Sequence, residues 1–89
     1  MLNPVYTKQF KKDVKLAKRR GKKLILLKDV MRLLIEKENL PARNRDHKLA
    51  GNFGDCRECH LEGDWLLIYR VSGEEIFFVR SGTHADLFE

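Results

Sequence analysis

No part of this 89-residue sequence approaches the roughly 18 consecutive apolar residues that a membrane-spanning helix needs. The opening stretch, MLNPVYTKQFKKD, also lacks the apolar segment of a secretory signal. Only two cysteines are present, and without a signal they are expected to remain free thiols in a reducing compartment. The lack of a membrane-spanning segment, of a secretory signal and of more than two cysteines predicts a cytoplasmic protein that has no membrane partner.

Internal repeats, low-complexity segments and linkers are absent as well, so the sequence predicts a single domain over residues 1–89. Hydrophobic residues make up 43% of the chain, which suffices for one compact core. Charged residues make up 35%, but they are spread among apolar ones. This mixture excludes disorder of the whole chain.

Positive charge is concentrated in the first half of the sequence. Residues 1–45 hold 14 Lys and Arg against 4 Asp and Glu, whereas residues 46–89 hold 4 against 9. A basic half of this kind favours a polyanion such as RNA or DNA as the partner. The alternative is a solvated face on lysine-rich helices, and the composition alone leaves it open.

Two helices are predicted after a short first strand. Residues 1–6 favour a first strand, in which Pro4 must lie at a sheet edge or at the start of the strand because it has no N–H to donate. Thr7 is a suitable N-cap for a first helix that ends at Gly21, and the apolar spacing predicts a second helix over residues 22–39. The apolar stripes of both helices are expected to cover a sheet.

The second half of the sequence predicts a loop and then three strands. Residues 41–54 contain Pro, Gly and Asn with little periodicity, which is typical of a loop. Strands are predicted over residues 56–62, 65–71 and 76–80, and the last residues are expected to form a tail. The order β-α-α-β-β-β indicates an α+β fold, in which helices lie on one face of a mostly antiparallel sheet.

The segment CRECH (56–60) fits the C-x-x-C-H pattern of covalent haem attachment. Side chains alternate between faces on a strand, so Cys56 and Cys59 are expected to point apart and cannot share a haem or a Zn²⁺ ion. A structural zinc site also needs a second ligand pair, and the other two histidines stand alone. No metal, haem or other cofactor is therefore expected. Cys59 is interpreted as a core residue and Cys56 as incidental.

The three histidines, His47, His60 and His84, lie in the second half, each within a few residues of a carboxylate. Because imidazole titrates near neutrality, one histidine can accept a proton while another donates one. Cleavage of RNA by its own 2′-hydroxyl needs both roles, together with a cation that offsets charge on the phosphate. Spacing alone does not bring the rings together, and a surface or hydrogen-bonded role is the ordinary one for each. A strand, the loop before it and a later segment can nevertheless meet at one end of a sheet.

Five segments together resemble a known family: KDVKLAKRR (12–20), DHKLAGN (46–52), RECH (57–60), DWLLIYRV (64–71) and RSGTHADLF (80–88). In their order and spacing they are similar to toxins of the RelE superfamily, in particular the YafQ branch of bacterial toxin–antitoxin systems. The resemblance covers nearly the whole chain. It implies two N-terminal helices packed on a twisted, mainly antiparallel sheet, in agreement with the element order above.

The resemblance implies a ribosome-dependent endoribonuclease that cleaves mRNA in the ribosomal A site without a metal. The expected partners are a cognate antitoxin, ribosomal RNA and mRNA, with neither membrane nor haem involved. The catalytic positions that the resemblance implies are His47, Glu58, His60, Asp64, His84 and Phe88. The candidate RNA-binding cations are Arg80, Lys11, Lys12, Lys15, Lys18 and Arg19.

The resemblance also suggests which catalytic role each of these residues has. His84 is expected to be the general acid at the leaving oxygen. His60 or His47, oriented by Asp64, is expected to be the base or to stabilise the phosphate. Arg80 is expected to bind the phosphate, and the lysine-rich helices are expected to bind ribosomal RNA. The affinity for ribosomal RNA should therefore fall as the salt concentration rises.

Phe88 is expected to position the message by packing or stacking. Two other hypotheses are kept at this point. One is a non-catalytic module that binds RNA or DNA through the same basic helices. The other is a haem or metal module built on residues 56–60.

Overall fold

A computed structural model describes the whole chain, residues 1–89. Its elements are, in order, β1 (Asn3–Tyr6), α1 (Lys8–Arg19), α2 (Leu24–Ile35), the 3-10 helix η1 (Ala42–Asn44), β2 (His47–Lys48), the 3-10 helix η2 (Gly51–Phe53), β3 (Arg57–Glu62), β4 (Trp65–Ser72), β5 (Glu75–Gly82) and α3 (His84–Phe88). None of the helices combines the length and the apolar character that crossing a membrane requires.

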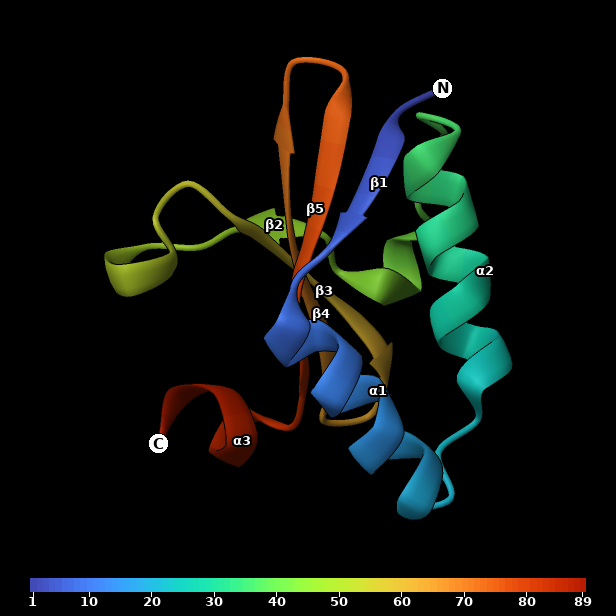
Figure 1. The fold of residues 1–89 in the computed structure, drawn as a ribbon, viewed down its shortest axis with the longest axis vertical. Helices are drawn as coiled ribbons and strands as arrows, with labels where there is room; N and C mark the ends of the chain where they lie inside the picture. Colours follow the sequence, from blue (N-terminus) through green and yellow to red (C-terminus); the bar gives the residue numbers. More distant parts are fainter.

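The strands form one five-stranded sheet in the order β1-β5-β4-β3-β2. β1 runs parallel to β5, and the other neighbouring strands are antiparallel. Helices α1 and α2 lie on one side of this twisted sheet, and α3 lies on the other side (Figure 1). The predicted α+β fold, with two helices before a mainly antiparallel sheet, is confirmed.

β1 is an edge strand, which is one of the two positions that Pro4 left open. The backbone N–H of Asn3 donates to the carbonyl oxygen of Glu74, just before β5, at 2.8 Å, and that of Thr7 donates to Phe78 on β5 at 3.3 Å. Alternation along the strand therefore turns Pro4 toward the open edge. Because proline has no N–H, that edge offers one donor fewer to a foreign strand.

α2 is shorter than the prediction and ends at Ile35. Lys37 has a positive φ of 60°. This left-handed residue lets the N–H groups of Lys37 and Glu38 donate back to Leu34 and Leu33 at 3.1 and 2.9 Å, which closes the last turn. Glycine is the usual signal for such an ending, and its absence explains why the prediction extended the helix.

Two elements were not predicted. Within the expected loop, the two residues of β2 pair with β3, His47 opposite Glu58 and Lys48 opposite Arg57. The expected tail forms α3, whose N-cap is Thr83. A two-residue strand has no apolar alternation of its own, so only its partner strand defines it.

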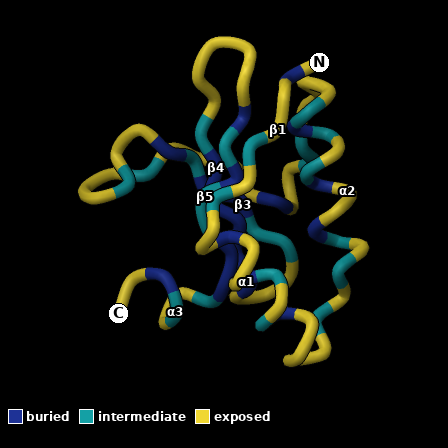
Figure 2. The backbone as a smooth tube through the Cα atoms, viewed as in Figure 1, coloured by how far each residue is buried: buried dark blue, intermediate teal, exposed yellow.

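Buried residues are concentrated along the strands of the sheet (Figure 2), and their apolar side chains form two clusters. The larger cluster lies beneath α1 and α2 and includes Phe10, Leu27, Trp65 and Phe78. The smaller cluster lies on the opposite face and consists of Cys56, Leu66, Ile68 and Leu87, with Leu49, Phe53 and Val79 packed against it. Leu87 is the contact through which α3 joins this second cluster.

The two cysteines are free and buried on opposite faces of the sheet. Their predicted divergence and the core position of Cys59 are confirmed. The interpretation of Cys56 as incidental is wrong, because its side chain packs in the smaller cluster. Burial raises the pKa of the Cys59 thiol to about 12 and also raises that of Cys56. No group of His, Cys, Asp and Glu side chains in the structure is arranged to hold a metal ion.

A buried carboxylate joins α1 to β5. Asp13 is 7% exposed and accepts hydrogen bonds from Arg80 Nε at 2.9 Å and Nη2 at 3.2 Å. It also accepts from the backbone N–H of Ser81 at 3.0 Å. Burying a charged group is costly unless it is paired and hydrogen-bonded, and these bonds, together with one from Gln9 Nε2 at 3.1 Å, offset that cost.

We predict that Asp13→Ala lowers the free energy of unfolding by about 3 kcal/mol, because it leaves the buried Ser81 N–H and the Arg80 guanidinium without their acceptor. Urea denaturation followed by circular dichroism measures the change. Asp29→Ala is the matched control, since Asp29 lies exposed on α2 without a hydrogen-bond partner. Equal losses in the two variants would contradict the role given to Asp13.

Candidate active site

The register of the sheet brings the three histidines to one region. His60 on β3 is paired with Leu66 on β4, and Leu66 is paired with Gly82 on β5. His84 follows Gly82 by two residues, while His47 lies on β2 at the other side of β3. The ring centroids of His47 and His60 are 6.4 Å apart, and those of His60 and His84 are 6.2 Å apart. His60 is therefore the middle ring of a row of three.

His47 has a polar contact at each ring nitrogen. Its Nδ1 lies 2.7 Å from the carbonyl oxygen of Arg45, which can only accept, so Nδ1 carries a proton. Its Nε2 lies 3.0 Å from Oε2 of Glu58. Glu58 is 4% exposed, and its other oxygen, Oε1, is buried without any hydrogen-bond partner. A proton shared between His47 and Glu58 joins the two side chains, and Oε1 remains as an unused acceptor.

His84 and Asp64 form a second pair. The Asp64 carboxylate contacts His84 Nδ1 and also accepts from the His84 backbone N–H at 3.2 Å. The hydrogen bond to Asp64 raises the pKa of His84, and the same contact lowers the pKa of Asp64. The prediction that Asp64 orients His60 or His47 is thus corrected, because its partner in the structure is His84.

His60 has the least engaged ring of the three. Its only hydrogen-bond contact is a long one of 3.5 Å from Nδ1 to the carbonyl oxygen of Gly63. A carbonyl only accepts, so in the neutral ring this contact favours the proton on Nδ1. The Nε2 lone pair is then free to accept a proton from a bound molecule.

Phe88 stands at the outer side of the row of rings. Its ring centroid lies 5.9 Å from that of His84 and 5.8 Å from that of Phe53, which it meets edge-on. The side chain is 45% exposed. A half-exposed aromatic ring beside an imidazole offers a face on which a base can stack.

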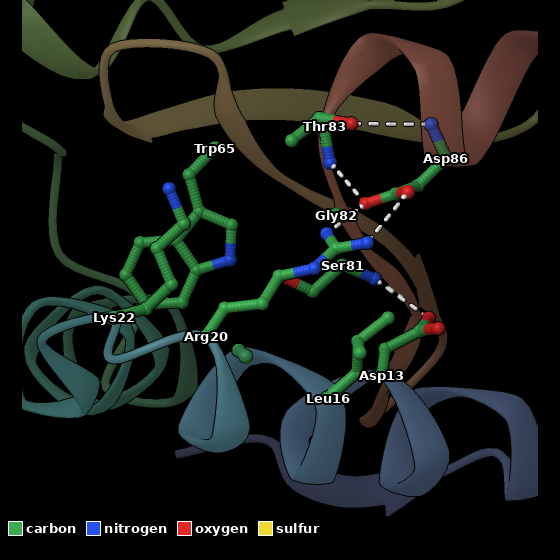
Figure 3. Close-up of a pocket in the computed structure, with 10 residues that line it drawn as sticks. Asp13, Leu16, Arg20, Lys22, Trp65, Ser81, Gly82, Thr83 and Asp86 are labelled. Atoms are coloured by element: carbon green, nitrogen blue, oxygen red, sulfur yellow. Dashed lines mark hydrogen bonds and ion pairs between the residues drawn. The ribbon is translucent and has the colours of Figure 1, made fainter.

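α3 is held in place by contacts of Asp86 (Figure 3). Asp86 Oδ2 accepts from the backbone N–H of Thr83 at 2.9 Å, while the Thr83 hydroxyl accepts from the N–H of Asp86 at 3.2 Å. Arg20, just after α1, donates to the same carboxylate at 2.7 and 3.3 Å and holds its pKa far below the usual range. A Cβ at Gly82 would lie 2.9 Å from that of Asp86, so only glycine fits there.

Sequence reasoning missed these supporting residues. The spacing Thr83-x-x-Asp86 is a capping-box pattern and was the available signal for α3. Its partner Arg20 lies 66 residues away, and no local pattern links the two.

The cations expected to bind RNA differ in their surroundings. Lys11, Lys12, Lys15, Lys18 and Arg19 are exposed along α1, and none forms an ion pair. Arg80 is different because Asp13 already binds its guanidinium. The α1 cations are therefore available to a polyanion, whereas Arg80 is engaged inside the fold.

Comparison with known proteins now identifies the chain. Residues 2–89 match the family described as bacterial toxin of type II toxin-antitoxin system, YafQ. The chain belongs to the YafQ family. A YafQ relative, the mRNA interferase toxin of Escherichia coli K12, is 46% identical over 84 residues, which cover 93% of this chain and 91% of the relative.

Solved structures agree with this assignment to the YafQ family. The crystal structure of YafQ from E. coli BL21(DE3) matches with a TM-score of 0.95 and 42% identity, and covers 100% of both chains. A crystal structure of the E. coli DinJ-YafQ toxin-antitoxin complex matches with a TM-score of 0.91 and 44% identity, over 99% of this chain and 98% of the other. The predicted membership of the YafQ branch is confirmed.

We predict that Asp64→Asn lowers the pKa of His84 toward its ordinary value of 6.5, because the carboxylate that stabilises the imidazolium is lost. A pH titration of the His84 Cε1–H signal by NMR measures the shift. The ion pair is complete above the ordinary pKa of Asp64, 3.8, and is lost as the pH rises through the pKa of His84. Glu38→Gln, a change at an exposed carboxylate without a partner, should leave the titration of His84 unchanged. An unaltered curve in Asp64→Asn would contradict the pairing.

Proposed function

We propose that this YafQ-family chain is an endoribonuclease that cuts mRNA in the ribosomal A site without a metal, and that a cognate antitoxin silences it. The observation that carries the proposal is the row of three imidazoles, two of them next to carboxylates, at one end of the sheet. The name mRNA interferase of the E. coli relative and the DinJ-YafQ complex support it. Action on ribosomes implies a cytoplasmic protein.

His84 is proposed as the general acid. Its Nδ1 faces Asp64, so Nε2 is the nitrogen that can meet a substrate. The hydrogen bond to Asp64 raises the pKa of His84, which stabilises the imidazolium relative to an ordinary histidine. That form donates the proton which the 5′-oxygen needs as its bond to phosphorus breaks.

His60 is proposed as the general base, because its Nε2 has no partner in the protein. It accepts the proton of the 2′-hydroxyl while the 2′-oxygen attacks phosphorus. The P–O5′ bond breaks, and His84 protonates the departing 5′-oxygen. The products are a 2′,3′-cyclic phosphate and a 5′-hydroxyl, with one proton taken up and one given.

His47 and Glu58 are proposed to stabilise the reacting phosphate and to position His60. The His47 ring lies beside the middle ring, at a centroid distance of 6.4 Å, and the proton that it shares with Glu58 can be donated to a phosphate oxygen. Phe88 is proposed to stack on a neighbouring base.

The test is to incubate the purified protein with mRNA in the presence and absence of ribosomes and to map the cut ends. We expect cleavage only on ribosomes, with a cyclic phosphate at the 3′ end, and no effect of a chelator. His84→Gln should lower kcat by at least about 100-fold, the usual contribution of a general acid.

The controls separate the nuclease from a non-catalytic RNA-binding module. The His84 side chain is 53% exposed, so His84→Gln should unfold at the same urea concentration as the wild type. A module that acts only by binding would keep its effect on translation in this variant. That outcome, or equal losses of activity and stability, would refute the proposal.

The exposed cations of α1 are proposed to contact ribosomal RNA. We predict that Lys11→Gln/Lys15→Gln weakens ribosome binding and lowers the slope of log affinity against log salt by roughly one per lysine. Binding of labelled protein to ribosomes at several salt concentrations measures this slope. Lys28→Gln/Lys37→Gln removes the same charge from exposed positions outside α1 and should change the slope little. Identical slopes in the two double variants would argue against a role for α1.

A further inference from the structure

A hollow beside His60 has no part in the site described so far. Its volume is about 610 Å³, which is within the range of small-molecule binding sites. Its lining includes Leu26, Arg43, Arg45, His60, Leu61 and Glu62. Because His60 contributes to the wall, the hollow opens directly next to the middle ring of the catalytic row.

The two arginines of the hollow are free, which sets them apart from most arginines of the chain. Five of the eight arginines pair with a carboxylate: Arg20, Arg32, Arg57, Arg70 and Arg80. The other three are Arg19, Arg43 and Arg45, and two of these line the hollow. A guanidinium without a carboxylate keeps its planar set of donors for a phosphate, which it can bind through two parallel hydrogen bonds.

The segment that carries these arginines is fixed to the histidines. Between them lies Asn44, which is 5% exposed and donates from Nδ2 to the carbonyl oxygen of His60 at 2.7 Å. Arg45 has a left-handed backbone, with φ at 47°, and its carbonyl oxygen accepts the Nδ1 proton of His47. The backbone at both arginines is thus held relative to His47 and His60, and the side chains are exposed.

The charge and the apolar part of the hollow fit a nucleotide. Two guanidinium groups face one carboxylate, that of Glu62, so the lining has an excess of positive charge. Leu26 and Leu61 supply apolar surface on which a ribose or a base can lie. An RNA chain that passes His60 therefore meets cationic and apolar groups in the same hollow.

We propose that this hollow binds the nucleotide of the message next to the scissile phosphate, with Arg43 and Arg45 on its phosphate group. The proposal rests on the proposed function, since it names a binding position for the same RNA substrate. It also assigns the phosphate-binding cations near the histidines to these two residues rather than to Arg80, which Asp13 engages.

The experiment uses the full chain and a hexaribonucleotide with 2′-O-methyl groups, which has no 2′-hydroxyl and cannot be cut. NMR titration should shift the side-chain Nε–H signals of Arg43 and Arg45 and the amide of Gly63. Arg43→Gln/Arg45→Gln should weaken binding at least tenfold and lower the salt slope by roughly 0.7, as expected when one phosphate of a single strand is no longer neutralised.

Lys28→Gln/Lys37→Gln is the matched control, because it removes the same charge from exposed positions away from the hollow and should change binding less than twofold. Equal weakening in both double variants, or no shift of the arginine signals in the wild type, would overturn the proposal. Binding of this oligonucleotide needs no chemistry. The result is therefore independent of the cleavage assay, in which failure of the wild type would overturn the proposed function instead.

Discussion

The arrangement of the layers depends on the carboxylate of Asp13. It lies on the inner side of α1 and accepts hydrogen bonds from the side chain of Arg80 and the backbone of Ser81. Both donors lie near the end of β5, directly before the turn into α3. One buried charge therefore fixes α1 against the strand from which His84 emerges, and the cost of its burial is offset by hydrogen bonds from Gln9, Arg80 and Ser81.

Asp86 repeats this arrangement at the end of the sheet, in the same pocket as Asp13. It caps α3 through Thr83 and accepts Arg20, which follows α1. α1 therefore contacts both the strand and the short helix that flank His84. A five-residue helix has little stability of its own, and these contacts, together with the burial of Leu87, hold it in position. The outer side of α1 remains free for its lysines.

The three histidines differ because their ring nitrogens have different neighbours. His47 is engaged at both nitrogens, His84 at one by a carboxylate, and His60 only by a long contact to a carbonyl oxygen. Three identical side chains are therefore suited to different roles in proton transfer. His47 shares a proton with its partner, His84 retains one, and His60 offers a free lone pair. The proposed assignment of acid and base follows from these contacts rather than from the order of the residues along the chain.

The sequence by itself determined the order of the two long helices and the four longer strands and the divergence of the cysteines, because periodicity, caps and proline act over a few residues. The resemblance of its motifs to YafQ toxins also named the three histidines before any geometry was known. Only the tertiary structure decided that Asp64 binds His84, that Arg80 is engaged by Asp13 and that Cys56 is buried. Those contacts join residues far apart in the chain, where no local pattern links one side chain to the other. The same reason explains β2, since a two-residue strand exists only through its pairing with β3.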